Sequence, residues 1–156
     1  MKKIYFTFFI LLLIFVSGCI GGTSKEEIND MIKGCENISS EYKKNSCYKN
    51  ISISLRNEEI CQRISDNNTK IWCVAVVNGD ADKCDEMKRT PESCYIEVAV
   101  NTKNPKICEK KLTGTIGKLT KDTCFFSVAV ASENKNTCDK VVDNDKKNLC
   151  YATITK

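Results

Sequence analysis

The stretch TPESCYIEVAVNTKNPKIC, residues 90–108, places one cysteine four residues after Thr90 and another four residues after Asn104. Thr and Asn side chains accept hydrogen bonds from the first amides of a helix. Pro91 and Pro105 stand at the next position, where the missing N–H of proline is not needed. The stretch therefore predicts two helices, each with its cysteine one turn inside.

The same pattern recurs along the chain in two alternating kinds of segment, with a repeat of about 25 residues. Long apolar segments such as CYIEVAV and CFFSVAV begin at Cys47, Cys73, Cys94, Cys124 and Cys150, and shorter ones at Cys35, Cys61, Cys84, Cys108 and Cys138. The expected capping residues four positions before a cysteine are Asn57, Asp80, Asn104 and Asn134 for short segments, and Thr69, Thr90 and Thr120 for long ones. This recurrent offset favours helices over strands, although the apolar runs are rich in β-branched residues.

Helix geometry selects which cysteines can pair. From Cys94 a helix of about ten residues runs roughly 15 Å before the turn towards Cys108, but a disulfide needs Cα atoms within about 4.4–6.8 Å. A short helix and the following long helix instead bring Cys84 and Cys94 to similar heights on an antiparallel hairpin. The predicted pairs are Cys35 with Cys47, Cys61 with Cys73, Cys84 with Cys94, Cys108 with Cys124, and Cys138 with Cys150. In the chain-entropy account, a disulfide that closes a loop of this size stabilises a fold by about 3 kcal/mol.

The predicted fold class is all-α: a disulfide-stapled array of short antiparallel helical hairpins, similar to an α-solenoid. Its buried face is expected at positions i, i+3 and i+4 of the long helices, namely Tyr95, Val98 and Ala99 with their counterparts Phe125, Val128 and Ala129. The array resembles the cysteine-rich helical-hairpin repeats related to tetratricopeptide and Sel1-like proteins. Its repeat is shorter than the tetratricopeptide unit of about 34 residues, and no peptide-binding motif of that family has a counterpart in this chain.

The first residues have the order of a secretory signal: two lysines, an apolar run from Ile4 to Val16, and small residues before Cys19. The run VSGC resembles the lipobox of prokaryotic lipoproteins, and the Lys-, Asn- and Ile-rich usage resembles archaeal ones. The resemblance implies cleavage before Cys19 and lipidation of Cys19. We therefore expect a signal peptide over 1–18, a lipidated tether over 19–24 and a repeat domain over 25–156. An uncleaved membrane helix is the alternative.

Composition excludes several classes of protein. The chain has no histidine and no CxxC pair, so neither a metal ion nor another cofactor is expected. Removal of Lys2 and Lys3 with the signal leaves a net charge of +2 with both signs interleaved, which predicts no nucleic-acid partner. No catalytic residue is expected, because the adjacent acids at 58–59 and 85–86 are typical of solvated first-turn charges. The chain is therefore predicted not to be an enzyme.

Three further features of the sequence bear on its local structure and its surface. Ser24 to Glu27 fits a capping box, with Gly34 as the expected helix stop. The Gly-containing stretch Leu112–Thr120 is either a tolerated insertion or a binding loop. The aromatic residues next to cysteines, which either pack in the core or line a groove, are Tyr48, Trp72, Tyr95 and Tyr151.

The sequons at Asn37, Asn50 and Asn67 are candidate glycosylation sites, unless they arise by chance in an Asn-rich chain.

The sequence predicts a protein that is lipid-anchored to the cell membrane and faces outside the cytoplasm. We expect a non-enzymatic interaction or scaffold module for a protein or glycan partner at the cell surface. A solute-binding lipoprotein of a transporter and a structural envelope component are the alternatives.

Overall fold

The structure is a computed structural model that describes residues 24–113 and 117–154. The predicted signal peptide and Cys19 lie outside these residues. The chain divides into two compact units, Met1–Asn37 and Ile38–Lys156. In chain order the elements are α2 (Lys25–Glu36), α3 (Glu41–Leu55), α4 (Glu58–Cys61), α5 (Asn67–Asn78), the 3-10 helix η1 (Asp82–Glu86), α6 (Pro91–Asn101), α7 (Pro105–Lys111), α8 (Gly117–Ser132), α9 (Lys135–Cys138) and α10 (Asn144–Ile154). Over the described ranges there is no strand, which confirms the all-α prediction.

The first unit contributes helix α2, whose start is the predicted capping box. Ser24 accepts a hydrogen bond from the Glu27 amide, and the Glu27 carboxylate accepts one from the Ser24 amide. The expected stop at Gly34 is wrong, because α2 continues to Glu36 and ends with the Asn37 amide donating to the Lys33 carbonyl. A single helical glycine costs only about 1 kcal/mol relative to alanine, so the capped helix runs through it.

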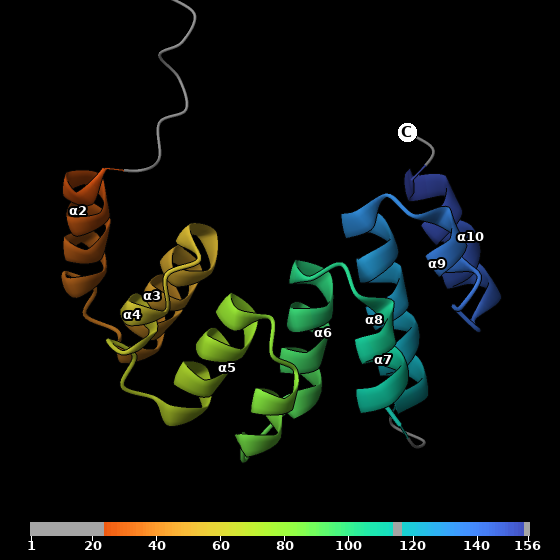
Figure 1. Ribbon diagram of the computed structural model, residues 1–156, viewed down its shortest axis with the longest axis horizontal. Helices are drawn as coiled ribbons and strands as arrows, with labels where there is room; N and C mark the ends of the chain where they lie inside the picture. Colours follow the sequence, from red (N-terminus) through yellow and green to blue (C-terminus); the bar gives the residue numbers. More distant parts are fainter. Residues whose placement is uncertain (1–23, 114–116, 155–156) are drawn as a thin grey trace, which may run out of the picture. The chain divides into compact units, whose positions relative to one another are not determined.

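The second unit is a row of hairpins in which a short helix precedes a long one (Figure 1). Disulfides join the two helices of each hairpin, with Cα–Cα distances of 5.8–5.9 Å. These pairs are Cys61–Cys73, Cys84–Cys94, Cys108–Cys124 and Cys138–Cys150, as helix geometry predicts. Each long helix packs against the next along the row, α3 on α5, α5 on α6, α6 on α8 and α8 on α10. The stapled hairpin array is therefore confirmed.

The fifth predicted pair, Cys35 with Cys47, would cross the boundary between the two units. Both cysteines take part in disulfide bonds. Their pairing with each other stays a prediction.

The turn after a long helix has one repeated form. The residues that follow the long helices all have a positive φ, between 50° and 69°: Arg56, Gly79, Lys103 and Glu133. The next residue is Asn or Asp, and its amide donates to a carbonyl five residues earlier, as in a Schellman motif. The residues that supply those carbonyls are small and fully buried: Ser52, Ala75, Ala99 and Ala129. A local motif therefore reverses the chain at the same point of each repeat.

The short helices begin where the sequence predicts. Asn57, Asn104 and Asn134 accept hydrogen bonds from the amide two residues ahead. Asp80 does the same for the Asp82 amide, although the 3-10 helix begins one residue later than its α-helical counterparts.

Of the three predicted threonine caps of the long helices, Thr90 alone stands at the N-cap position, and the predictions for Thr69 and Thr120 are wrong. Thr69 is three residues inside the cap of α5, because the Asp66 carboxylate accepts from the Thr69 amide instead. Thr90 stands at the start of α6 with left-handed backbone (φ 49°) and makes no capping bond. Thr120 lies within α8, which starts at Gly117. The expected loop Leu112–Thr120 is therefore shorter than the sequence indicated.

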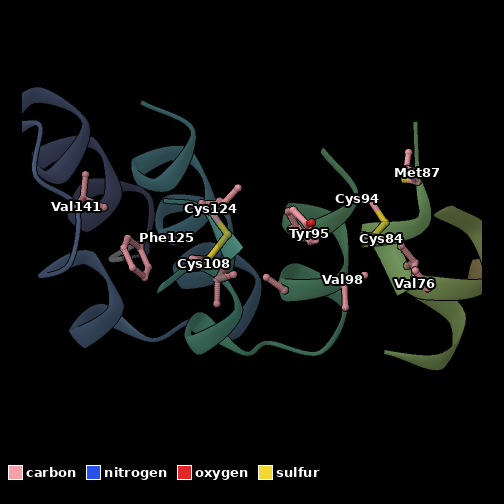
Figure 2. Packing of buried hydrophobic residues seen from close by; sticks show 14 residues of the cluster. Val76, Cys84, Met87, Cys94, Tyr95, Val98, Cys108, Cys124, Phe125 and Val141 are labelled. Atoms are coloured by element: carbon pink, nitrogen blue, oxygen red, sulfur yellow. A yellow bond between two sulfur atoms is a disulfide. The ribbon is translucent and has the colours of Figure 1, made fainter. Parts of the chain in front are cut away.

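The core runs along the inner face of the hairpins (Figure 2). Tyr95, Val98 and Ala99 are buried, as are Phe125, Val128 and Ala129, so the predicted i, i+3, i+4 face is confirmed. A second set of buried residues follows each short-helix cysteine by three or four positions: Ile64, Met87, Leu112 and Val141. The hydrophobic core of one hairpin therefore continues into the next.

Candidate functional site

A pocket of about 560 Å³ lies at the edge of the row where α3, α5 and α6 begin. Its apolar and aromatic lining residues are Tyr42, Trp72 and Met87. Its charged residues are Glu41, Asp66 and Arg89. Amide and hydroxyl groups come from Asn45, Asn68, Thr69 and Thr90. Three successive long helices and the links before them therefore build one concave surface.

One wall of the pocket is fixed by Ser65, the link residue before α5. The Asn45 side-chain amide donates to the Ser65 hydroxyl at 3.0 Å, and the Ser65 amide donates back to Asn45 Oδ1 at 3.1 Å. The Ser65 hydroxyl donates to the Glu41 carboxylate. Asn45 is buried and both ends of its side chain are satisfied, so this wall is rigid before any ligand arrives.

Asp66 lines the pocket and caps α5. Its Oδ2 accepts from the Thr69 hydroxyl at 2.7 Å and from the Thr69 amide at 2.8 Å. These two bonds, with a smaller contribution from the positive charge of Arg89, hold the pKa of Asp66 below its usual value. A carboxylate with a lowered pKa is a poor general base at neutral pH but remains a good hydrogen-bond acceptor.

Arg89 is positioned by the backbone beside it. Asn68 Oδ1 accepts from the Lys88 amide at 3.1 Å, which fixes the link before α6 against α5. Asn45 and Ser65 form the same kind of bond one repeat earlier, and Asp122 accepts from the Val142 amide two repeats later. Each of these bonds spans 20 residues, so a periodic contact between neighbouring hairpins sets the shape of the pocket.

The Trp72 ring makes a cation–π contact with Lys49. The Lys49 ammonium lies 4.1 Å from the centroid of the indole ring, and it also pairs with Glu97 at 3.1 Å. The indole N–H is buried and has no hydrogen-bond partner among the described residues. A buried donor in this state costs about 1–3 kcal/mol, so the fold tolerates an unfavourable group at this site.

A separate polar cluster lies on the short-helix layer. Lys111 pairs with Asp82 at 2.6 Å and with Asp85 at 2.7 Å, and the Tyr95 hydroxyl donates to Asp85. Burial, followed by this hydrogen bond, raises the pKa of Tyr95 to about 12. The bonds from Lys111 and Tyr95 lower the pKa of Asp85. Asp85 is an exposed charge in the first turn of its helix, as expected, and its carboxylate also links two hairpins.

The other candidate residues are distributed along the chain. Tyr48 and Tyr95 are buried, and the Tyr151 hydroxyl donates to Asp139, whereas Trp72 lines the pocket. The sequons at Asn37, Asn50 and Asn67 are exposed, and their glycosylation stays a prediction. Lipidation of Cys19 also stays a prediction. The structure thus brings only Trp72, out of the aromatic residues singled out from the sequence, into the candidate site.

Within the described ranges, no group of three or more Cys, Asp or Glu side chains is arranged to hold a metal ion. In the same part of the chain, no helix is both long and apolar enough to cross a bilayer. Comparison with protein-family models, with curated proteins and with solved structures finds no match to this chain.

Sequence reasoning missed most of the pocket residues. Tyr42 and Arg89 are single residues in polar stretches, and the Lys49–Glu97 pair joins helices two repeats apart. The sequence held one signal for the pocket, which is Trp72. It is the single tryptophan of the chain and stands directly before a long-segment cysteine, where the other repeats carry Ser, Thr or Leu.

Proposed function

We propose that this protein is a lipid-anchored, non-enzymatic interaction module on the outer side of the cell membrane. The observation that carries the proposal is the pocket at Trp72, an aromatic surface on a disulfide-fixed scaffold. A binding surface held by covalent staples loses little conformational entropy when a partner arrives.

The chemistry of the pocket supports binding rather than catalysis. Its carboxylates are engaged as acceptors, Asp66 by Thr69 and Glu41 by Ser65. The described cysteines are bound in disulfides and supply no thiolate nucleophile. The pocket offers an aromatic surface together with side chains that donate hydrogen bonds and side chains that accept them.

The extracellular location is supported by cysteine usage. Disulfides persist in oxidising compartments and are rare in a reducing cytoplasm, and four of them staple the second unit. A lipidated Cys19 would place the array next to the membrane, where two lipid chains hold a protein stably and a single one does not.

Photo-crosslinking on intact cells tests the interaction. A photoreactive phenylalanine analogue replaces Tyr42 on the pocket rim in one variant and Val142 in the last repeat in another. The two sites are equally exposed, at 80% and 79%, so accessibility does not distinguish them. We expect one crosslinked species of defined mass from position 42 and none from position 142. Equal products from both positions, or none from either, would contradict the proposal.

Mass spectrometry of the same preparation tests the anchor. We expect the first peptide of the purified protein to begin at Cys19 and to carry a lipid mass. A first peptide that still contains residues 1–18 would show an uncleaved anchor in its place.

A further inference from the structure

We propose that the pocket at Trp72 is a saccharide-binding site that takes a neutral pyranose unit. The inference deepens the proposed function and rests on it, since it names the chemistry of the surface partner. It starts from the groups that surround the pocket: the rings of Tyr42 and Trp72, the carboxylates of Glu41 and Asp66, and the guanidinium of Arg89.

The charges around the pocket disfavour an ionic ligand. Two carboxylates and a single guanidinium line the pocket, so an anion such as a phosphate would meet Glu41 and Asp66 as well as Arg89. A cation that approached the Trp72 ring would be repelled by the Lys49 ammonium, which already lies over this ring at 4.1 Å from its centroid. A neutral ligand rich in hydroxyl groups avoids both repulsions.

The arrangement of polar and apolar groups matches a sugar ring. A pyranose has an apolar C–H face and a rim of hydroxyl groups that both donate and accept hydrogen bonds. The pocket offers an aromatic surface from Trp72, acceptors from Asp66 and Glu41, and planar donors from Arg89. A volume of about 560 Å³ falls within the range of about 300–1,000 Å³ typical of small-ligand sites.

The polar groups are also pre-positioned. Asp66 is fixed by Thr69, Glu41 by Ser65, and the backbone before Arg89 by Asn68. Hydrogen bonds to hydroxyl groups add more affinity when their partners are already ordered, because ordering them on binding costs free energy. The described chain offers no exposed strand edge to which a peptide backbone could add.

Fluorescence of Trp72 tests the inference directly, because Trp72 is the single tryptophan of the chain. The purified full chain, with its disulfides intact, is kept in a polyoxyethylene detergent so that no sugar head group competes. Glucose, galactose, mannose, N-acetylglucosamine and their disaccharides are titrated in turn. Tetramethylammonium chloride, inorganic phosphate and triglycine amide serve as cationic, anionic and peptide probes. We expect a saturable change in Trp72 emission with at least one saccharide and none with the other probes.

Two variants locate the site. Arg89→Ala removes the charged donor and Tyr42→Ala removes an aromatic ring, and both residues are exposed, so the fold is retained. We expect Arg89→Ala to weaken saccharide binding about tenfold, the loss usual for one hydrogen bond to a charged group. We expect Tyr42→Ala to weaken it as well, because an aromatic ring that packs on the sugar is lost. Arg56→Ala, at a pocket on the opposite edge of the row, is the matched control and leaves the affinity unchanged.

The outcomes separate this inference from the proposed function. Saturation with the ammonium salt, phosphate or triglycine amide in place of a saccharide would overturn the saccharide assignment. A flat titration with every saccharide would also overturn it, but a specific crosslink from position 42 would still support an interaction module. A saccharide response that Arg89→Ala and Arg56→Ala reduce equally would show that binding lies elsewhere and would reject the site.

Discussion

Lys49 of α3 and Glu97 of α6 form an ion pair, with Nζ 3.1 Å from Oε2, although α5 lies between their helices in the row. The Lys49 ammonium also lies over the Trp72 ring of α5. A contact that skips one repeat forms only where side chains of the first and third helices meet above the second. These three residues therefore tie three long helices together next to the candidate site.

Removal of this contact should be visible at Trp72. We expect Lys49→Ala to shift Trp72 emission to longer wavelength, because the ring loses its cover. The free energy of unfolding should fall by about 1 kcal/mol, the sum usual for a cation–π contact and a partly exposed ion pair. Lys83→Ala is the control, since its pair with Glu86 is a surface contact within one short helix. Identical emission spectra for the two variants would show that Lys49 does not cover the ring.

Disulfide mapping tests the hairpin pairing. Proteolysis of the non-reduced protein should give a peptide that joins Cys84 to Cys94, whose Cα atoms are 5.9 Å apart. Replacing both cysteines by alanine should lower the free energy of unfolding by about 3 kcal/mol, because the unfolded chain regains the freedom of the closed loop. Denaturant unfolding under oxidising conditions measures the loss. A peptide joining Cys94 to Cys108 would refute the architecture.

Gly79 and Gly34 should respond to alanine in opposite directions. At Gly79, φ is +69° and an added Cβ would lie 2.9 Å from Thr102 Cγ2, so we expect a loss of about 1–2 kcal/mol. At Gly34, inside α2, an added Cβ meets nothing within 4 Å, so we expect a gain of about 0.5–1 kcal/mol. Thermal unfolding followed by circular dichroism measures both. Repeating Gly79→Ala in a Thr102→Ser background removes the clash and leaves only the backbone strain.

Tyr95 should make stability depend on pH at the alkaline end. The pKa of Tyr95 is raised to about 12, above the value of about 10 for a free tyrosine. The folded state thus favours the neutral phenol, and the resulting stability is complete below pH about 10 and lost as pH rises through about 12. We expect Tyr95→Phe to flatten this part of the curve, measured by denaturant unfolding at a series of pH values. Tyr42→Phe, at an exposed site, controls for the loss of a hydroxyl; equal curves for both variants would contradict the assignment.

Much of the fold followed from local patterns. The Asn and Asp residues before the short helices, the cysteine spacing and the i, i+3, i+4 apolar face each act within one hairpin. The pairing of Cys84 with Cys94 could be predicted because the distance along the short helix from Cys84 to the turn nearly equals the distance along the long helix from the turn to Cys94. The start of α5 could not, because Asp66 and Thr69 are both residues that cap helices, and the helix begins after the earlier one, whose carboxylate accepts from the Thr69 amide.

The sequence by itself determined the repeating unit, because capping, turn reversal and disulfide reach are decided within about 25 residues. Only the tertiary structure decided the pocket, whose lining comes from the first turns of successive long helices and the links before them. Their approach depends on how each long helix rotates against the next, and that rotation is set by core side chains and by hydrogen bonds that span 20 residues. Residues such as Lys49 and Glu97 meet only after this packing is complete, so no local pattern records their contact.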